Sequence, residues 1–261
     1  MNRAMRTAAS GMQGQQLLVD TIANNIANAN TTGFKKSRLA FRSLLYQTMR
    51  EPGAPTAGTQ MSPSGLQVGS GTEVASSQRS FVQGEIESTG GMLDVAIVGE
   101  GFFEIAMPSG EIRYTRDGSF QMDGSGQLVT ADGFRVEPGI NIDQDAVNVT
   151  ISQDGRVLVQ DAAGTISDAG QLRLARFPNP AGLKAMGANL YMATESSGAA
   201  TQLTPGDAGA GILRHQYRER SNVTVVEELI ELIQAQRNYE INSRTIRVSD
   251  EMMQQLGNLI R

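Results

Sequence analysis

The chain has 261 residues, which corresponds to one or two domains, and its net charge at neutral pH is −5. It contains no cysteine, which excludes disulfide bonds, thiolate nucleophiles, cysteine-ligated zinc and iron–sulfur clusters. No apolar run approaches the roughly 18 residues of a helical membrane span, and no apolar stretch of the length of a cleavable signal follows Arg3 and Arg6.

The first 30 residues have the periodicity of an amphipathic helix. Apolar residues recur every seven positions, and Gln15 is a polar member of the same face. Gly11 and Gly14 each cost about 1 kcal/mol in helix propensity, so this helix needs a partner. The asparagines from Asn24 onward are expected to end it, with Gly33 as a natural stop. The predicted seam consists of Met5, Met12, Val19, Ile22 and Ile26.

Residues 51–72 are rich in proline and glycine, which is typical of an extended arm or linker. Residues 1–50, which precede it, carry seven basic residues and one acidic residue. Aromatic residues are not interleaved with these charges. The basic residues of this segment are therefore expected to lie in solvent or at a contact, and not to form a nucleic-acid-binding arm.

The middle of the chain alternates with a period of two. Asp-Gly pairs at 117–118 and 154–155, and the turn residues 123–126, separate short alternating segments, which favours β-hairpins. The sequence therefore predicts an antiparallel β domain. Residues 51–211 carry nineteen acidic and eight basic residues, and such a surface would repel nucleic acid.

The C-terminal 40 residues predict a second and stronger helix. Ser221 or Asn222 is the expected cap, followed by Glu227 and Glu228 near the positive end of the helix. The companion positions Ala235, Asn242 and Ser249 are small or polar, which suits a helix with several neighbours in a larger array. A helical hairpin within one chain is the alternative. The predicted seam consists of Val225, Leu232, Tyr239, Ile246, Met253 and Ile260.

The sequence offers no recognisable catalytic, cofactor or metal site. His215 is the only histidine, and no Gly-x-Ser-x-Gly elbow or phosphate-binding loop is present. Gly99-Glu-Gly101 lacks the third glycine of a dinucleotide fingerprint. We expect no catalytic residue, no cofactor and no metal.

Several segments in order resemble the bacterial flagellar rod and hook proteins. Residues 23–36 (ANNIANANTTGFKK) are similar to their N-terminal signature, residues 81–103 to the entry of their β domain, and residues 221–256 to their C-terminal helix. Residues 114–120 and 128–134 extend the match, which spans nearly the whole chain.

The resemblance implies a structural subunit that polymerises helically into a rigid, hollow drive shaft crossing the periplasm, in which paired termini line an export channel. The implied partners are further copies of the chain, other rod proteins below, a hook-side protein above, the surrounding P- and L-ring proteins and the flagellar type III export apparatus. Such export would explain the missing cleavable signal. No nucleic acid, small-molecule substrate, cofactor or enzymatic activity is implied.

The predicted fold class is α+β, with a discontinuous helical coiled-coil domain (1–32 and 222–261), an extended arm (33–75) and an antiparallel all-β domain (76–221). Within the arm, residues 46–54 and 63–69 resemble a stretch of the distal-rod members that is implied to stiffen the tube. The stiffening residues are Tyr46, Arg50, Glu51, Pro52, Pro55 and Pro63.

Two alternative functions remain open at this point. One is a proximal-rod subunit of the same family, which would differ in residues 46–69. The other is a wall-associated β-domain hydrolase with helical anchors.

Overall fold

The computed structural model describes residues 2–52, 55–57, 60–61, 63–143, 145–207 and 209–259. The chain divides into two compact units. The first, here the helical unit, comprises Met1–Ile26, Ser37–Gln78 and Thr224–Arg261. The second, here the β unit, comprises Ala27–Lys36 and Arg79–Val223. Residues 27–36 belong to the β unit, because hydrogen bonds described below join them to it. The sequence instead predicts that they are divided between the helical domain and the arm.

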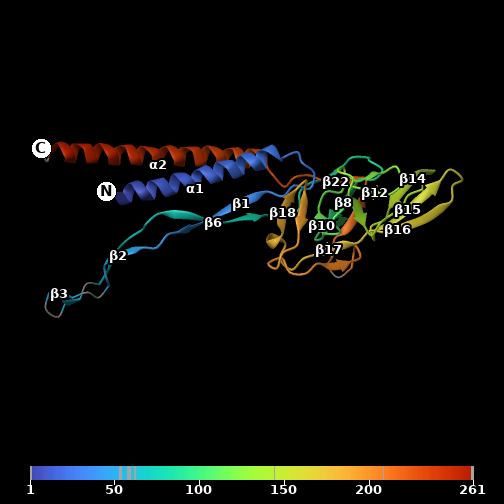
Figure 1. The fold of residues 1–261 in the computed structure, drawn as a ribbon, viewed down its shortest axis with the longest axis horizontal. Coiled ribbons are helices and arrows are strands. Elements are labelled where there is room, and N and C mark those ends of the chain that lie inside the picture. The colour runs from blue at the N-terminus through green and yellow to red at the C-terminus, as the bar shows by residue number, and fades with distance from the viewer. Residues whose placement is uncertain are drawn as a thin grey trace. The chain divides into compact units, whose positions relative to one another are not determined.

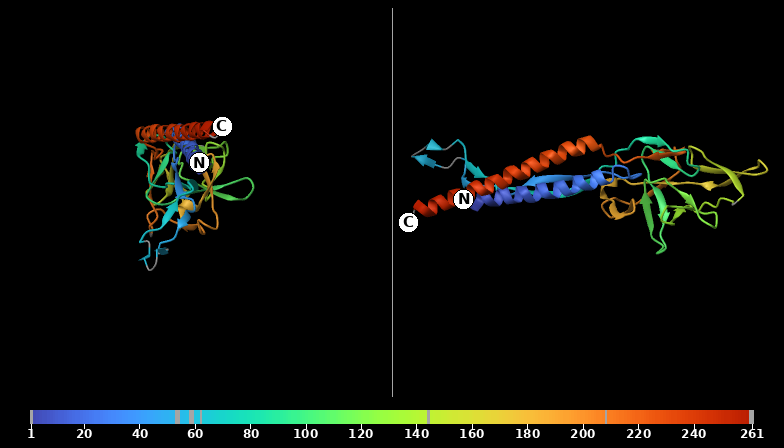
Figure 2. Two further views of the ribbon diagram at one scale, coloured as in Figure 1. Left: turned by 90° about the vertical axis from the view of Figure 1, so that its left-hand side faces the viewer. Right: turned by 90° about the horizontal axis from the view of Figure 1, so that it is seen from above.

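The helical unit contains both long helices, α1 (Asn2–Ala27) and α2 (Val225–Leu259), which lie side by side (Figures 1 and 2). The structure places Asn24 and Asn25 inside α1, which ends only at Ala27. In α2 the Glu228 N–H donates to the Thr224 carbonyl oxygen at 3.1 Å, so the helix begins after Thr224. Neither Ser221 nor Asn222 is in the capping position. No helix in the described part of the chain is long and apolar enough to cross a membrane.

Residues 37–78 form a two-stranded ribbon. The sequence predicts an extended arm or linker here. The structure pairs β1 (Ser37–Ser43) with β6 (Thr72–Arg79), β2 (Gln47–Arg50) with β5 (Leu66–Val68) and β3 (Pro55–Ala57) with β4 (Gln60–Met61) (Figure 1). The ribbon satisfies backbone donors and acceptors that an isolated arm would leave to water. Gly65 allows a close approach, since a Cβ there would lie 2.7 Å from the Arg50 carbonyl oxygen.

The β unit is built from antiparallel strands, as predicted. Its largest sheet has seven strands in the order β11 (Gln121–Met122), β12 (Leu128–Val129), β13 (Arg135–Glu137), β9 (Phe103–Ala106), β10 (Ile112–Thr115), β19 (Leu190–Met192) and β18 (Lys184–Gly187). A three-stranded sheet contains β14 (Ala146–Ile151), β15 (Arg156–Asp161) and β16 (Ile166–Gln171). Smaller pairs join β17 (Leu174–Arg176) to β20 (Thr201–Leu203), β21 (Ile212–His215) to β8 (Val95–Val98), and β22 (Tyr217–Glu219) to β7 (Ile86–Ser88). A short 3₁₀ helix spans Pro180–Gly182.

The core of the β unit is mainly aliphatic. Its buried members include Val95, Ile97, Phe103, Ile105, Leu128, Val136, Ile140, Leu172, Leu174 and Leu213. A separate aromatic cluster contains Phe81, Phe102, Tyr114, Phe177 and Tyr191, with edge-to-face ring centroids 4.7–6.1 Å apart. A chain with 5% aromatic residues thus concentrates several of them at one place.

The predicted hairpins are only partly present. The turns at 123–126 and 154–155 join the paired strands β11–β12 and β14–β15. The Asp117-Gly118 pair does not close a hairpin, because β10 pairs with β9 and β19. Gly118 instead lies against the backbone of Val95, where a Cβ would be 1.7 Å from the carbonyl oxygen.

Candidate assembly surface

The two long helices contact each other through small and polar side chains. The Asn25 side chain donates to Glu228 Oε2 at 3.0 Å, and both residues are buried. Nearer the N-terminus, a Cβ on Gly11 would lie 2.9 Å from Asn242 Nδ2, so glycine allows the helices to approach closely. On α2 the buried positions are Glu228, Ala235 and Ser249, which are separated by seven and by fourteen residues.

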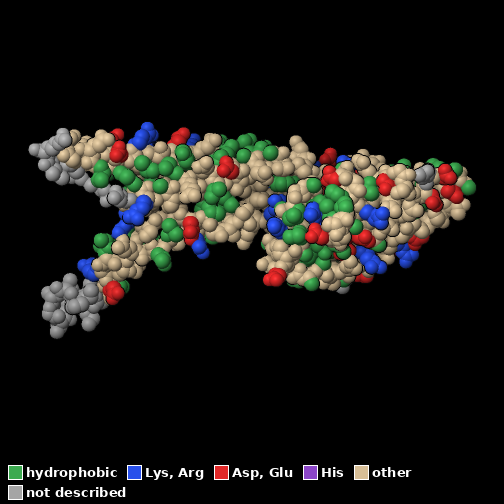
Figure 3. All heavy atoms as spheres, viewed as in Figure 1, with side chains coloured by type: hydrophobic (Ala, Val, Ile, Leu, Met, Phe, Trp, Pro, Cys, Tyr) green, Lys and Arg blue, Asp and Glu red, His purple; other side chains and the backbone are tan. Residues whose placement is uncertain are grey.

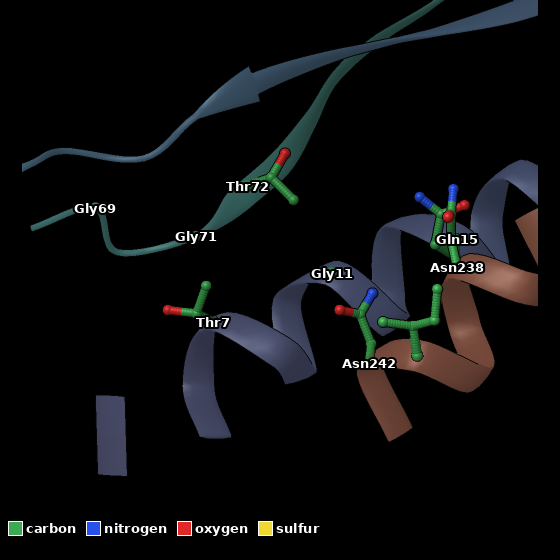
Figure 4. A pocket seen from close by; sticks show the side chains of 9 residues that line it. Thr7, Gly11, Gln15, Gly69, Gly71, Thr72, Asn238 and Asn242 are labelled. Atoms are coloured by element: carbon green, nitrogen blue, oxygen red, sulfur yellow. The ribbon is translucent and has the colours of Figure 1, made fainter. Parts of the chain in front are cut away.

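A groove of about 490 Å³ opens beside this contact. Thr7, Gly11 and Gln15 line it from α1, Asn238 and Asn242 from α2, and Gly69, Gly71 and Thr72 from the ribbon (Figure 4). Gln15 Oε1 is buried and accepts no hydrogen bond within the described residues. The polar position expected in the α1 seam therefore lies at this groove.

The opposite face of α2 is exposed and largely apolar. With 3.6 residues per turn, it lies away from Glu228, Ala235 and Ser249. Figure 3 shows hydrophobic side chains gathered along the part of α2 nearer its first residue. The exposed members of this face are Val226, Leu229, Ile230, Ile233, Ile241, Val248 and Met252, of which Ile241 lies at the edge and also lines the groove.

The predicted α2 seam lies between these two faces. Val225, Tyr239 and Met253 are exposed to 41%, 43% and 39%, while Leu232 and Ile246 are half-buried. Ile260 lies outside the described residues. The structure thus shows that α2 presents its small and polar row to α1, and leaves the predicted apolar row only partly covered within the chain.

The predicted α1 seam is more enclosed. Ile22 is 1% exposed, and Met5, Met12, Val19 and Ile26 are half-buried.

The ribbon also exposes apolar side chains. Leu45 is 90% exposed, and Tyr46, Met49 and Leu66 are exposed as well. Arg50, Glu51, Pro52 and Pro63 are exposed, and Pro55 begins β3. Arg3 on α1 donates to the Gln47 side chain, which links the ribbon to the helix within the same unit.

Among the described residues, no group of three or more His, Asp or Glu side chains is placed to hold a metal ion. His215 makes a hydrogen-bonding contact of 2.9 Å between Nε2 and the Met92 carbonyl oxygen. Burial raises the pKa of Glu104, while a hydrogen bond from Gln202 opposes the rise.

Comparison with known proteins identifies three matching family models. The flagella basal body rod protein model matches residues 5–35, the flagellar hook protein FlgE/F/G D1 domain matches 96–159, and the flagellar basal body rod FlgEFG protein C-terminal model matches 214–259. The flagellar basal-body rod protein FlgG of Borreliella burgdorferi is 47% identical over 264 residues, covering 100% of both chains. The FlgG proteins of Caulobacter vibrioides (47% identity, 98% and 99% coverage) and Bacillus subtilis (42% identity, 100% of both chains) are similarly related.

The chain belongs to the flagellar basal-body rod protein family. It is a structural subunit of the flagellar rod located in the basal body, where it assembles with other flagellar proteins. Because its relatives are structural rod proteins, it is not an enzyme, which decides against the hydrolase alternative. The resemblance stated from the sequence is confirmed.

Two features of this rod-family chain were not expected from its sequence. The buried Asn25–Glu228 contact joins residues 203 positions apart, and the groove combines three separate segments. Neither leaves a local pattern. The one sequence feature that pointed to the groove was Gln15, a polar residue in a seam of otherwise apolar or small residues.

Proposed function

We propose that this rod subunit forms the distal rod, where copies assemble helically into a rigid, hollow shaft that transmits torque and encloses part of the export channel. In this assembly the terminal helices pack as a multi-partner coiled coil. The seams predicted from the sequence, together with the outer face of α2, form the contacts between copies.

The observation that carries this proposal is the exposed apolar face of α2. Seven large apolar side chains there are at least 44% exposed. Apolar burial contributes about 25 cal/mol per Å², or about 1 kcal/mol for each half-exposed side chain that a neighbour covers. A contact that joins different faces of identical subunits generates an open helical polymer when its rotation does not close a ring, and this is the symmetry a shaft requires.

The ribbon provides a second contact. Leu45, Tyr46, Met49 and Leu66 offer apolar side chains, while Arg50 and Glu51 add exposed charges worth about 0–1 kcal/mol each when paired. Pro52 and Pro63 restrict φ and lower the entropy lost on ordering. We propose that the ribbon braces axial neighbours and so stiffens the shaft.

A place in the distal rod determines the proteins that the shaft is proposed to contact. The shaft would contact other rod proteins below, a hook-side protein above and the P- and L-ring proteins around it. It would cross the periplasm after export through the flagellar type III apparatus, without a cleavable signal.

The test is a matched pair of substitutions on α2 in a strain that lacks its own copy of the protein. Ile233→Asp places a carboxylate on the outer apolar face, whereas Ile233→Leu keeps an apolar side chain of the same size at the same position. Burying an unpaired carboxylate costs several kcal/mol and recurs in every subunit. Isolated basal bodies should lack the distal rod with Ile233→Asp and carry it with Ile233→Leu. Normal rods with both variants would contradict the proposal.

Labelling the chain with a tag distinguishes a distal-rod subunit from a proximal-rod subunit of the same family. If a tag on the chain localises to the proximal part of the rod, the distal assignment is wrong.

A further inference from the structure

The chain passes between the helical unit and the β unit four times, after residues 26, 36, 78 and 223. On the β side these passages fall in three short segments, which are residues 27–36, 79–84 and 219–223. A single covalent connection has two soft dihedrals per residue and swivels easily. How these segments are held to one another therefore decides how well a twist passes along the chain.

Asn222 joins all three segments through its side chain. Its Oδ1 accepts a hydrogen bond from the Lys36 N–H at 2.8 Å. Its Nδ2 donates to the carbonyl oxygens of Ser80 at 2.8 Å and Val82 at 3.0 Å. The Ser80 N–H in turn donates to the Lys36 carbonyl oxygen at 2.9 Å, which closes the ring of contacts. Lys36, Ser80 and Asn222 each lie within two residues of a passage between the units.

A buried cluster of charged side chains involves residues close in sequence to those that Asn222 contacts. Lys35 Nζ is 2.6 Å from Glu219 Oε1 and also donates to the Val82 carbonyl oxygen at 2.8 Å. Arg116 Nε is 3.1 Å from Glu219 Oε2. The side chains of Lys35 and Glu219 are fully buried. The same three segments are therefore joined a second time, two of them by the Lys35–Glu219 ion pair and the third by the hydrogen bond from Lys35 to Val82.

The backbones in this region are closely packed. The Gly84 N–H donates to Glu219 Oε1 at 2.9 Å, and a Cβ on Gly84 would lie 2.1 Å from the Arg220 carbonyl oxygen. The Gly33 N–H donates to the Glu219 carbonyl oxygen at 2.8 Å, with Gly33 at a φ of +67°. Short contacts of this kind leave little room for one segment to slide along another.

We propose that Asn222 and the Lys35–Glu219–Arg116 cluster form a torsional clamp that couples the β unit to the helical unit when the rod rotates. This rests on the proposed function as a drive shaft. Cross-linking the segments makes them move together, so a twist applied to the β unit reaches the helices without being absorbed by backbone rotation. Glu219 accepts hydrogen bonds from Lys35, Arg116 and the Gly84 N–H. Asn222 completes the clamp with hydrogen bonds from an uncharged side chain.

The test compares Asn222→Ala with Asn179→Ala. Asn179 is the matched control, because its Nδ2 also donates to a backbone carbonyl, that of Ser196 at 3.0 Å, within the same unit but away from the passages. In the purified protein, the Lys36 amide should exchange its hydrogen about tenfold faster with Asn222→Ala than with the control. In cells that form complete rods, the torsional compliance measured between motor and filament should rise by about twofold, while the control matches the wild type.

Asn222→Asp provides the second variant. Aspartate keeps an acceptor for the Lys36 N–H, but its second carboxylate oxygen would face the Ser80 and Val82 carbonyl oxygens with no hydrogen to donate, so its compliance should be at least as high as that of Asn222→Ala. Faster amide exchange with unchanged compliance would show that the contacts only stabilise the β unit and would overturn the clamp. The absence of rods with both variants, despite native circular dichroism, would also overturn it in favour of a role in assembly. Failure of the wild-type chain itself to enter rods would instead refute the proposed function.

Discussion

Replacing Asn25 with alanine should destabilise the helical unit by about 3–4.5 kcal/mol. The Asn25 side chain makes three hydrogen bonds of 3.0 Å: it donates to Glu228 Oε2 and to the Ser37 carbonyl oxygen, and it accepts from the Ser37 N–H. The two contacts with Ser37 contribute about 1 kcal/mol each, and the contact with the carboxylate contributes about 1.5–3 kcal/mol. Alanine recovers about 0.5 kcal/mol in helix propensity.

The measurement is denaturant unfolding of the full chain followed by the helical signal at 222 nm. Asn24→Ala is the control, since Asn24 is an exposed neighbour on the same helix and experiences the same change in propensity. The difference between the two variants therefore reports how much more the contacts of Asn25 contribute to stability than those of Asn24. A difference below about 1 kcal/mol would refute the argument that this residue joins α1 to both α2 and the ribbon.

Three further outcomes are expected. Gly84→Ala should lower the melting temperature of the β unit in a thermal scan, because its Cβ would meet the Arg220 carbonyl oxygen at 2.1 Å; an unchanged transition would contradict this packing. Because burial raises the pKa of Glu104 in the folded chain, the contribution of Glu104 to stability should be most favourable while this carboxyl is protonated and should be lost as the pH rises through its pKa. The free energy of unfolding, measured across this pH range, should fall less with Glu104→Gln than with the wild type. The same dependence on pH in both proteins would contradict this role of Glu104. Deletion of residues 47–64 should leave the β unit folded and yield bent or more flexible rods in electron micrographs, whereas straight rods of normal length would mean that the ribbon is a passive surface loop.

Periodicity located both terminal helices, but it did not determine which face of each meets the other. In α2, the apolar row from Val225 and the small row through Ala235 both repeat every seven residues. The small row lies against α1 because Gly11 leaves room for Asn242 there. That choice depends on a partner more than 200 residues away, and no local pattern records it.

The β unit shows the same limit. Short alternating segments with Asp-Gly turns predicted antiparallel strands, and two of the turns close hairpins. The Asp117-Gly118 pair does not, since Val95 lies against the position where a hairpin would turn. The roles of Asn222 and Glu219 were equally hidden, because each depends on segments that meet only after folding.

The contrast between the two units has a thermodynamic consequence. The heat-capacity change on unfolding is set mainly by the apolar surface that becomes hydrated. In the two long helices the buried residues are mostly small or polar, such as Ala8, Asn25, Glu228 and Ala235, with Ile22 as a large apolar member, whereas the β unit buries an extended aliphatic core. Calorimetry of the chain should therefore assign most of this heat-capacity change to the β unit. The helical unit should have a flatter stability curve and respond less to cooling, so that a single two-state transition does not describe the whole molecule.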